Sequence, residues 1–259
     1  MTARPLVVIT RDDGPEGRFA AALAARGLEA FALPTIAIRP SADVARLDAA
    51  LAELGSGDWL AFTSAQAVAA VQERPAWNRL VAGARPRIAA VGSATAARLR
   101  ESGAQPDLVA DEPGAGGLAA ALARSGGLDD VHVVWPRSDR ARSELAERLR
   151  ASGARVTEVV AYRTEPVASP LLADFQRLLS AGRLAAIAFL SPSSAAGLAA
   201  ALGASDLGLL AGRALVASIG PTTSAALREL QAPPQVEASR PGVDALADAL
   251  AATLTGASS

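Results

Sequence analysis

Residues 6–34, LVVITRDDGPEGRFAAALAARGLEAFALP, have a second version at residues 132–160, HVVWPRSDRARSELAERLRASGARVTEVV. Each stretch has the pattern of an apolar strand, a turn with an arginine, an Ala/Leu/Arg-rich helix, a glycine and a second strand. Arg11 and Arg137 stand 126 positions apart, as do Gly27 and Gly153. Strands that alternate with helices in this way predict parallel βαβ packing, with the glycines as helix C-terminal caps.

Two further pairs of segments repeat at nearly the same spacing. DWLAFTSAQAVAAV (58–71) matches AAIAFLSPSSAAGLAAAL (185–202), and AVGSATAARL (90–99) matches SIGPTTSAAL (218–227). Three matches at nearly one offset indicate an internal duplication, because chance similarity would not keep the spacing constant. The sequence therefore predicts two similar α/β domains.

Two extended segments, LPTIAIRP (33–40) and VVAYRTEP (159–166), occupy equivalent places in the two copies. Both end in proline, and they could pair as a two-stranded bridge. The pattern leaves two arrangements open. Either the first domain is continuous, or the chain crosses over early and returns late.

Composition excludes several kinds of chemistry. The chain has 259 residues, 51% of them hydrophobic, with no cysteine, no lysine and one histidine, His132. Disulfides, thiolate metal sites, a cysteine nucleophile, multi-histidine metal sites and lysine Schiff bases are therefore excluded. A net charge of −1 and 3% aromatic residues argue against nucleic-acid binding. The N-terminus does not resemble a signal peptide, and no apolar run could span a membrane, so we expect a cytoplasmic protein.

Hydroxyl groups gather where predicted strands end and helices begin. Helix N-termini at the carboxyl ends of parallel strands suit carboxylates and phosphates, because their N–H groups lack internal partners. A simpler interpretation is that each Ser or Thr only caps its helix. The candidate binding residues in these turns are Thr63, Ser64, Ser93, Thr95, Ser191, Pro192, Ser193, Gly220, Pro221, Thr222 and Thr223.

Three other side chains could carry chemistry. Arg11 and Arg137 follow equivalent strands, and an arginine fork recognises carboxylates, although a solvated charge is the simpler interpretation of most arginines here. Tyr162 is the chain's only tyrosine, and it could equally be a packing aromatic at a domain junction. His132 begins a strand that has a buried pattern, so we interpret it as structural.

The motifs Phe62-Thr63-Ser64, VGSAT, AYRT, FLSPSS and IGPTT, in this order and at these spacings, resemble the uroporphyrinogen-III synthase family over essentially the whole chain. The resemblance implies an α/β fold of two similar flavodoxin-like parallel-sheet domains, joined by a two-stranded linker ladder, with the active site in the cleft between them. It also implies an early crossover. Domain 1 would comprise residues 1–35 and 167–259, domain 2 residues 41–161, and the linkers residues 36–40 and 162–166.

The resemblance further implies a reaction. Hydroxymethylbilane, a linear tetrapyrrole with eight carboxylates, would lose water and close to uroporphyrinogen III with ring D inverted, in heme, sirohaem or cobalamin biosynthesis. No cofactor is implied. Tyr162 matches the proposed proton donor to the leaving hydroxyl, and the hydroxyl-bearing turns match those that hold substrate carboxylates. We expect a monomer, with transient contact to hydroxymethylbilane synthase, and neither nucleic acid nor a membrane as partner.

A different class of protein fits the same pattern. Two similar α/β domains on two linkers also describe a hinged anion-binding or regulatory protein that has lost catalysis. The AYRT motif with Tyr162 and the two threonine turns favour the enzyme.

Overall fold

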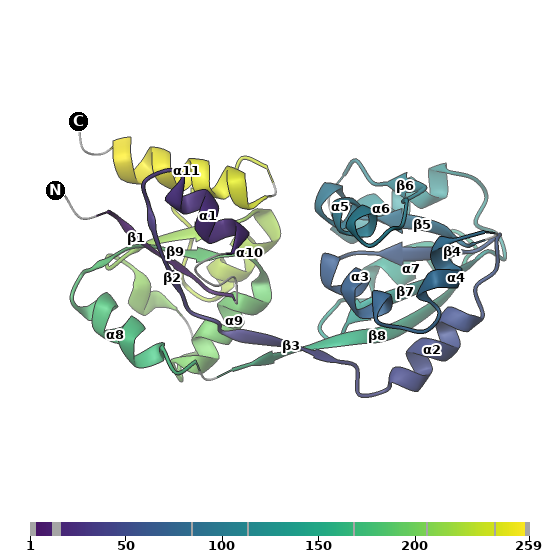
Figure 1. Cartoon of the computed structure of the whole chain (residues 1–259), viewed down its shortest axis with the longest axis horizontal. Coiled ribbons are helices and arrows are strands. Elements are labelled where there is room, and N and C mark those ends of the chain that lie inside the picture. Colours follow the sequence, from purple (N-terminus) through teal and green to yellow (C-terminus); the bar gives the residue numbers. More distant parts are fainter. Residues whose placement is uncertain are drawn as a thin grey trace. The chain divides into compact units, whose positions relative to one another are not determined.

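The chain folds into two compact units. The structure, a computed structural model, describes residues 4–11, 17–83, 85–112, 114–167, 169–205, 207–240 and 242–256. Unit 1 comprises Met1–Ala37 and Glu165–Ser259, and unit 2 comprises Ile38–Thr164 (Figure 1). The turn that the sequence predicts between the first strand and the first helix has residues 12–16 outside the described part.

Unit 1 is built on a parallel sheet of five strands in the order β11-β10-β9-β1-β2, in which all neighbouring strands are parallel. Its strands are β1 (Leu6–Ile9), β2 (Glu29–Ala32), β9 (Leu184–Phe189), β10 (Leu215–Ser218) and β11 (Val236–Glu237). Its helices are α1 (Arg18–Ala24), α8 (Leu172–Ser180), α9 (Pro192–Ala201), the 3₁₀ turn η1 (Gly208–Leu210), α10 (Pro221–Glu229) and α11 (Val243–Gly256).

Unit 2 contains the second sheet, in the order β3-β8-β7-β4-β5-β6. Its strands are β3 (Ile36–Pro40), β4 (Trp59–Phe62), β5 (Arg87–Ala90), β6 (Leu108–Val109), β7 (His132–Ser138) and β8 (Arg155–Pro166). Its helices are α2 (Val44–Ala52), α3 (Ala65–Gln72), α4 (Trp77–Val81), α5 (Ser93–Glu101), α6 (Gly114–Arg124) and α7 (Glu144–Ala151).

Strands β3 and β8 carry the chain between the units and lie beside each other in the sheet order. Val167 N donates to Thr35 O at 3.1 Å, whereas Arg163 Nε donates to Pro40 O at 3.5 Å. The residue numbers rise along one strand as they fall along the other, so the two strands are antiparallel. The pairs β8–β7, β7–β4, β4–β5 and β5–β6 are parallel.

The two sheets share one strand order, which confirms the predicted fold class of two similar parallel-sheet α/β structures. Taken along the repeat, β1, β2, β9, β10 and β11 stand in the order 2-1-3-4-5, which is flavodoxin-like. Strands β7, β8, β4, β5 and β6 repeat that order in unit 2, and β3 is added at the edge beside β8. Of these five repeated strands, the chain forms β4 first, which is the third strand of the repeat. Strand pairing keeps the sequence offset, because Leu6 opposes Glu29 just as His132 opposes Arg155.

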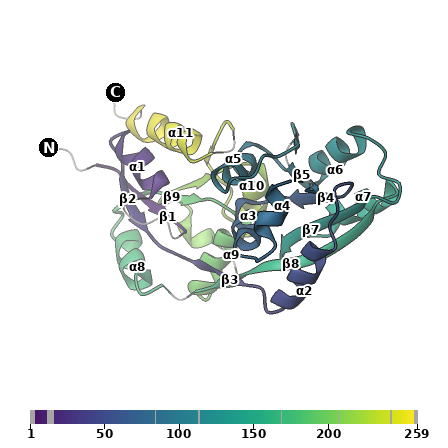
Figure 2. The ribbon, with the colours of Figure 1, turned by 45° about the vertical axis from the view of Figure 1, so that its right-hand side comes forward.

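Both faces of each sheet are buried, as continuous apolar strands predict. In unit 1, Val7 and Ile9 pack with the α1 and α11 side, while Val8 packs with the α8 and α9 side. Helices α1 and α11 lie side by side on their face (Figures 1 and 2). Each large apolar side chain buried in this way contributes about 1.5–3 kcal/mol.

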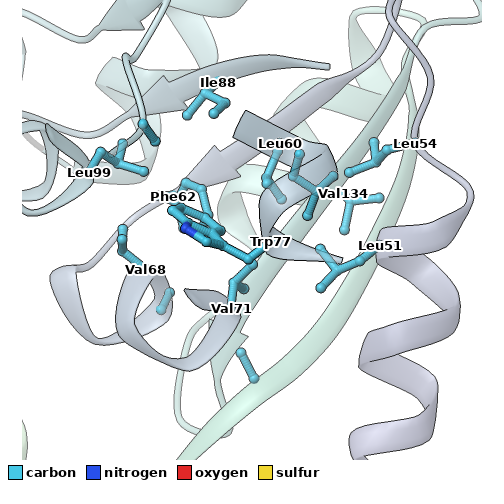
Figure 3. Packing of buried hydrophobic residues seen from close by; sticks show 14 of the residues in the cluster. Leu51, Leu54, Leu60, Phe62, Val68, Val71, Trp77, Ile88, Leu99 and Val134 are labelled. Carbon is cyan, nitrogen blue, oxygen red and sulfur yellow. The ribbon is translucent and has the colours of Figure 1, made fainter. Parts of the chain in front are cut away.

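The same alternation organises unit 2. Leu60 and Phe62 of β4 belong to the cluster that includes residues of α2, α3 and α5, whereas Trp59 and Ala61 belong to the cluster with α6 and α7. Figure 3 shows Leu60 and Phe62 among side chains from other elements, including Leu51 and Trp77. A one-residue shift of β4 would exchange its two faces, so the packing fixes the strand register.

Two smaller expectations are also confirmed. Gly27 and Gly153 follow their helices with φ of 76° and 90°, a conformation that glycine adopts at little cost. His132 is 5% exposed, and its Nε2 lies 2.8 Å from Thr157 Oγ1 on the neighbouring strand, as a structural histidine would. Within the described residues, no helix combines the length and apolar character that crossing a bilayer requires.

We predict that Gly197→Ala destabilises unit 1, because helix α9 touches the backbone before β3 at this residue. A Cβ on Gly197 would lie 2.5 Å from Thr35 O and 2.7 Å from Ile36 Cγ2. Overpacking of this kind costs about 1–3 kcal/mol, which thermal or urea unfolding would detect. Gly127→Ala is the matched control, since no atom lies within 4 Å of its added Cβ. Equal losses in both variants would contradict the account.

Candidate active site

In each unit, two hydroxyl-bearing turns lie at the same edge of the sheet. The turns of unit 2 follow β4 and β5, and those of unit 1 follow β9 and β10. The strands of each pair are hydrogen-bonded neighbours and run parallel. The helices that begin at these turns also pack in pairs, α3 with α5 and α9 with α10. Each unit therefore presents two adjacent helix N-termini at one sheet edge.

The turns before α3 and α9 are closed by serine caps. Ser64 Oγ accepts from Ala67 N at 3.1 Å, and Ser191 Oγ accepts from Ser194 N at 3.2 Å. Both serines have extended backbones and directly precede their helices. The simple capping interpretation is therefore correct for Ser64 and Ser191. Pro192 and Ser193 fill the next two positions of α9 and are half-buried.

The turns before α5 and α10 are different, because glycine precedes each helix. Gly92 and Gly220 are the N-caps, and no side chain makes a capping hydrogen bond at either. The capping interpretation is therefore wrong for the hydroxyls of these turns, namely Ser93, Thr95, Thr222 and Thr223. The amide groups of both first turns remain available to an anion, which the helix dipole also favours.

Thr95 and Thr223 occupy the third position of these two helices. They are only 5% and 3% exposed. In the described part of the chain, neither hydroxyl has a hydrogen-bond partner. Ser93, Pro221 and Thr222 are exposed at the starts of the same helices. A buried threonine whose hydroxyl lacks an internal partner suits a group that meets a ligand.

Tyr162 on β8 lies beside the first turn of α3. Its ring is 8% exposed, and its Oη lies 3.1 Å from Ser64 Oγ. Burial raises the pKa of Tyr162 above its ordinary 10.0, and the charge of Asp139 also raises it, while hydrogen bonding with Ser64 and Ser138 lowers it. The phenol is therefore protonated at neutral pH and can act as a proton donor.

Two residues that sequence reasoning did not select hold the backbone around Tyr162. A register shift after Arg137 sets Ser138 opposite Tyr162. Asp139 N donates to Tyr162 O at 3.2 Å, and Asp139 Oδ1 accepts from Thr164 N and from Ser138 Oγ, both at 3.1 Å. The sequence signal for both is the polar run SDR directly after a buried strand.

Thr63 and Arg137 make hydrogen bonds and an ion pair with neighbouring residues of unit 2. Thr63 Oγ1 accepts from Trp135 Nε1 at 3.0 Å. Arg137 Nε lies 3.2 Å from Glu158 Oε2, and Arg137 Nη1 donates to the carbonyls of Ser138 and Ala141 at 3.1 and 3.0 Å. Arg137 therefore stabilises the backbone at the end of β7. Arg11 lies exposed after β1 in unit 1.

A cavity of about 370 Å³ adjoins Tyr162 within unit 2. Its apolar lining comes from β3, α2, α3 and β8, and its polar lining includes two arginines, a glutamine and a glutamate. The lining residues used below are Val44, Leu47, Ala70, Ala161 and Tyr162, with Arg39, Gln66, Glu73 and Arg74.

Comparisons with known proteins find matches that span nearly the whole chain. The family model for uroporphyrinogen-III synthase HemD matches residues 17–248. A uroporphyrinogen-III synthase of Synechococcus elongatus is 32% identical over 261 residues, which cover 95% of this chain and 96% of that protein.

Solved structures match in fold. A mutant uroporphyrinogen III synthase from the extremely thermophilic bacterium Thermus thermophilus is 20% identical with a TM-score of 0.65, covering 97% of this chain and 99% of that one. Uroporphyrinogen-III synthetase from Helicobacter pylori 26695 is 17% identical with a TM-score of 0.60, covering 95% and 97%.

Removing the hydroxyl of Ser64 should affect both its helix and Tyr162. We predict that Ser64→Ala and Ser191→Ala each cost about 1 kcal/mol of stability through the lost cap. Only Ser64→Ala should change the pKa of Tyr162. This pKa should rise further in that variant, because the hydrogen bond with Ser64 lowers it in the unsubstituted protein. Absorbance of tyrosinate at alkaline pH reports Tyr162 alone, as the chain has one tyrosine. An unchanged titration in Ser64→Ala would refute the coupling.

Proposed function

The chain belongs to the uroporphyrinogen-III synthase family, and we propose that Tyr162 supplies the proton its reaction needs while glycine-started turns bind substrate carboxylates. The family model spans most of the chain, and the cyanobacterial relative is 32% identical over nearly its full length. The protein is accordingly a hydro-lyase of tetrapyrrole biosynthesis. Its substrate is hydroxymethylbilane, a flexible chain of four pyrroles with eight carboxylates.

The reaction breaks one C–O bond and forms a ring. Tyr162 Oη–H gives its proton to the departing hydroxyl, which leaves as water, and the adjacent pyrrole nitrogen stabilises the resulting cation. The substituted α-carbon of ring D attacks this cation and forms a spiro intermediate. The older bond from that carbon to its methylene bridge then breaks, and the freed bridge bonds to the unsubstituted α-carbon of ring D, which inverts the ring. The proton that this second carbon loses restores the phenol, so the net change is the loss of one water. Inversion of ring D distinguishes the product from the type I isomer that forms without enzyme.

The observation that carries this proposal is the state of the Tyr162 hydroxyl. It is buried, its pKa is raised, and it lies 3.1 Å from Ser64 Oγ, which orients it. A phenol kept protonated at neutral pH can donate but cannot act as a base before it has donated. Because the cation is resonance-stabilised, one positioned acid suffices, and such an acid contributes on the order of 10²–10⁴-fold.

Positioning of the flexible substrate falls to the turns after β5 and β10. The first-turn amides that follow Gly92 and Gly220 can bind carboxylates. The hydroxyls of Thr95 and Thr223 belong to the same turns and can donate to the same carboxylates. Selecting one folded conformer is an entropic task, for which several anchored carboxylates are well suited. Arg137 contributes indirectly, because its guanidinium is already engaged with Glu158 and two carbonyls.

We predict that Tyr162→Phe lowers kcat for uroporphyrinogen III formation about 10²-fold or more, since it removes the proton but keeps the ring. The melting temperature and KM should change little, because phenylalanine preserves the packing. Single-turnover assays with isomer analysis measure the effect. An unchanged kcat would remove the proton-donor role from Tyr162.

Thr95→Val and Thr223→Val should each raise KM for hydroxymethylbilane about tenfold, through a lost hydrogen bond to a charged group. Stability should change little, because neither hydroxyl has an internal partner among the described residues. Thr35→Val is the opposite control, since Thr35 Oγ1 donates to Thr10 O or Ser194 O at 2.9 or 3.0 Å. That variant should lose stability and keep its KM. Destabilised Thr95→Val with normal KM would indicate a purely structural threonine.

A further inference from the structure

We propose that the cavity beside Tyr162 is the subsite for a single pyrrole ring, the one that carries the leaving hydroxyl. The proposal rests on the proton-donor role of Tyr162 and adds what holds the reacting ring next to it. It follows from the cavity's lining and from a comparison of the two copies of the repeat.

The lining of the cavity suits a small aromatic ring. Val44 and Leu47 of α2, Ala70 of α3 and Ala161 of β8 supply apolar surface (Figure 1 shows these elements). Tyr162 also lines the space, and its hydroxyl is held by Ser64. Ligand sites of this kind are mostly apolar with a few placed polar groups. A volume of about 370 Å³ accommodates a pyrrole with its two carboxylate arms.

The duplicated unit shows that this space is not a general property of the fold. Helix α8 (Leu172–Ser180) stands in unit 1 where α2 (Val44–Ala52) stands in unit 2, at the repeat offset of 128. Leu47 therefore corresponds to Phe175, which is fully buried in the core of unit 1. The smaller leucine lines a cavity where the other copy has an aromatic ring.

A second difference points the same way. Ala70 corresponds to Gly197, and Ala161 and Tyr162 correspond to Thr35 and Ile36. In unit 1 even a methyl group on Gly197 would lie 2.5 Å from Thr35 O, so helix and backbone touch. In unit 2 the Cβ of Ala70 is present and faces the cavity. The copy that holds the tyrosine is thus the copy in which helix and strand stand apart.

The lining also holds charged groups that could bind the arms of a pyrrole. Arg39 and Arg74 bring two guanidinium groups and Glu73 brings one carboxylate. Arg74 is fixed in place by Asp48 through two hydrogen bonds of 2.7 Å. Each pyrrole of the substrate carries an acetate and a propionate arm, and guanidinium groups at the border of an apolar space can bind such carboxylates. A ring seated there would lie next to Tyr162, which lines the same space.

The test uses porphobilinogen, a monopyrrole with one acetate and one propionate arm, on the full-length protein. Replacing the single tyrosine by 3-fluorotyrosine gives one fluorine NMR line, which reports the surroundings of Tyr162. We expect this line to shift saturably with porphobilinogen, with a dissociation constant of about a millimolar for so small a ligand.

Two variants fill the cavity from different elements. Leu47→Phe copies the residue of unit 1, and Ala70→Leu fills the space from α3. Each should weaken porphobilinogen binding about tenfold or more and raise KM for hydroxymethylbilane. Ala52→Leu, at an exposed position of α2 outside the cavity, is the matched control and should bind normally. Melting temperatures identify any variant that is misfolded. If one cavity-filled variant misfolds, the other can still be compared with the control.

An unmoved fluorine line in the unsubstituted protein would overturn the subsite, as would equal binding by the control and a folded, cavity-filled variant. Failure of the proposed function looks different. In that case Tyr162→Phe would form uroporphyrinogen III at the normal rate, whatever porphobilinogen does. Binding of the monopyrrole by a protein whose Tyr162→Phe variant is fully active would therefore retain the cavity as a pyrrole site and reject only the proton transfer.

Discussion

Parallel strands all end at one edge of their sheet, and the functional arrangement of this protein depends on that constraint. A helix must begin soon after each strand, so the N-termini of α3 and α5 come together in one unit and those of α9 and α10 in the other. The hydrogen bond between Ser64 and Tyr162 uses this edge. A serine that would otherwise only cap a helix also orients the one phenol of the chain.

The duplication explains how similar units acquire different roles. Serine caps close α3 and α9 in the same way, while glycines leave the starts of α5 and α10 open to a ligand. The units differ at many positions, and three of these differences concern the cavity. Tyr162 stands where unit 1 has Ile36, and Leu47 and Ala70 stand where it has Phe175 and Gly197. These replacements place the chain's one tyrosine beside a cavity in one copy, with the strand order unchanged.

Much of the fold could be predicted from the sequence, because the periodicity of apolar residues and the spacing of the repeat can be read directly from it. The repeat offset predicted equivalent strands, and the pairing of Leu6 with Glu29 and of His132 with Arg155 confirms it. The roles of individual hydroxyls could not be predicted, since they depend on where each helix begins. Ser64 directly precedes α3, whereas Thr95 is the third residue of α5. The engagement of Arg137 with Glu158 depends on β7 and β8 being neighbours. The cavity depends on which residues face it from four elements, β3, α2, α3 and β8, and composition does not reveal that.

The central claim is that Tyr162 protonates the leaving group. It is tested most directly by changing that group instead of the enzyme. A bilane whose hydroxyl is replaced by an acyloxy group can lose a carboxylate without receiving a proton. The ratio of kcat between the unsubstituted protein and Tyr162→Phe should be about 10² or more with hydroxymethylbilane and close to one with the acyloxymethyl substrate. An equal ratio for both substrates would contradict proton donation and leave Tyr162 with a positioning role alone.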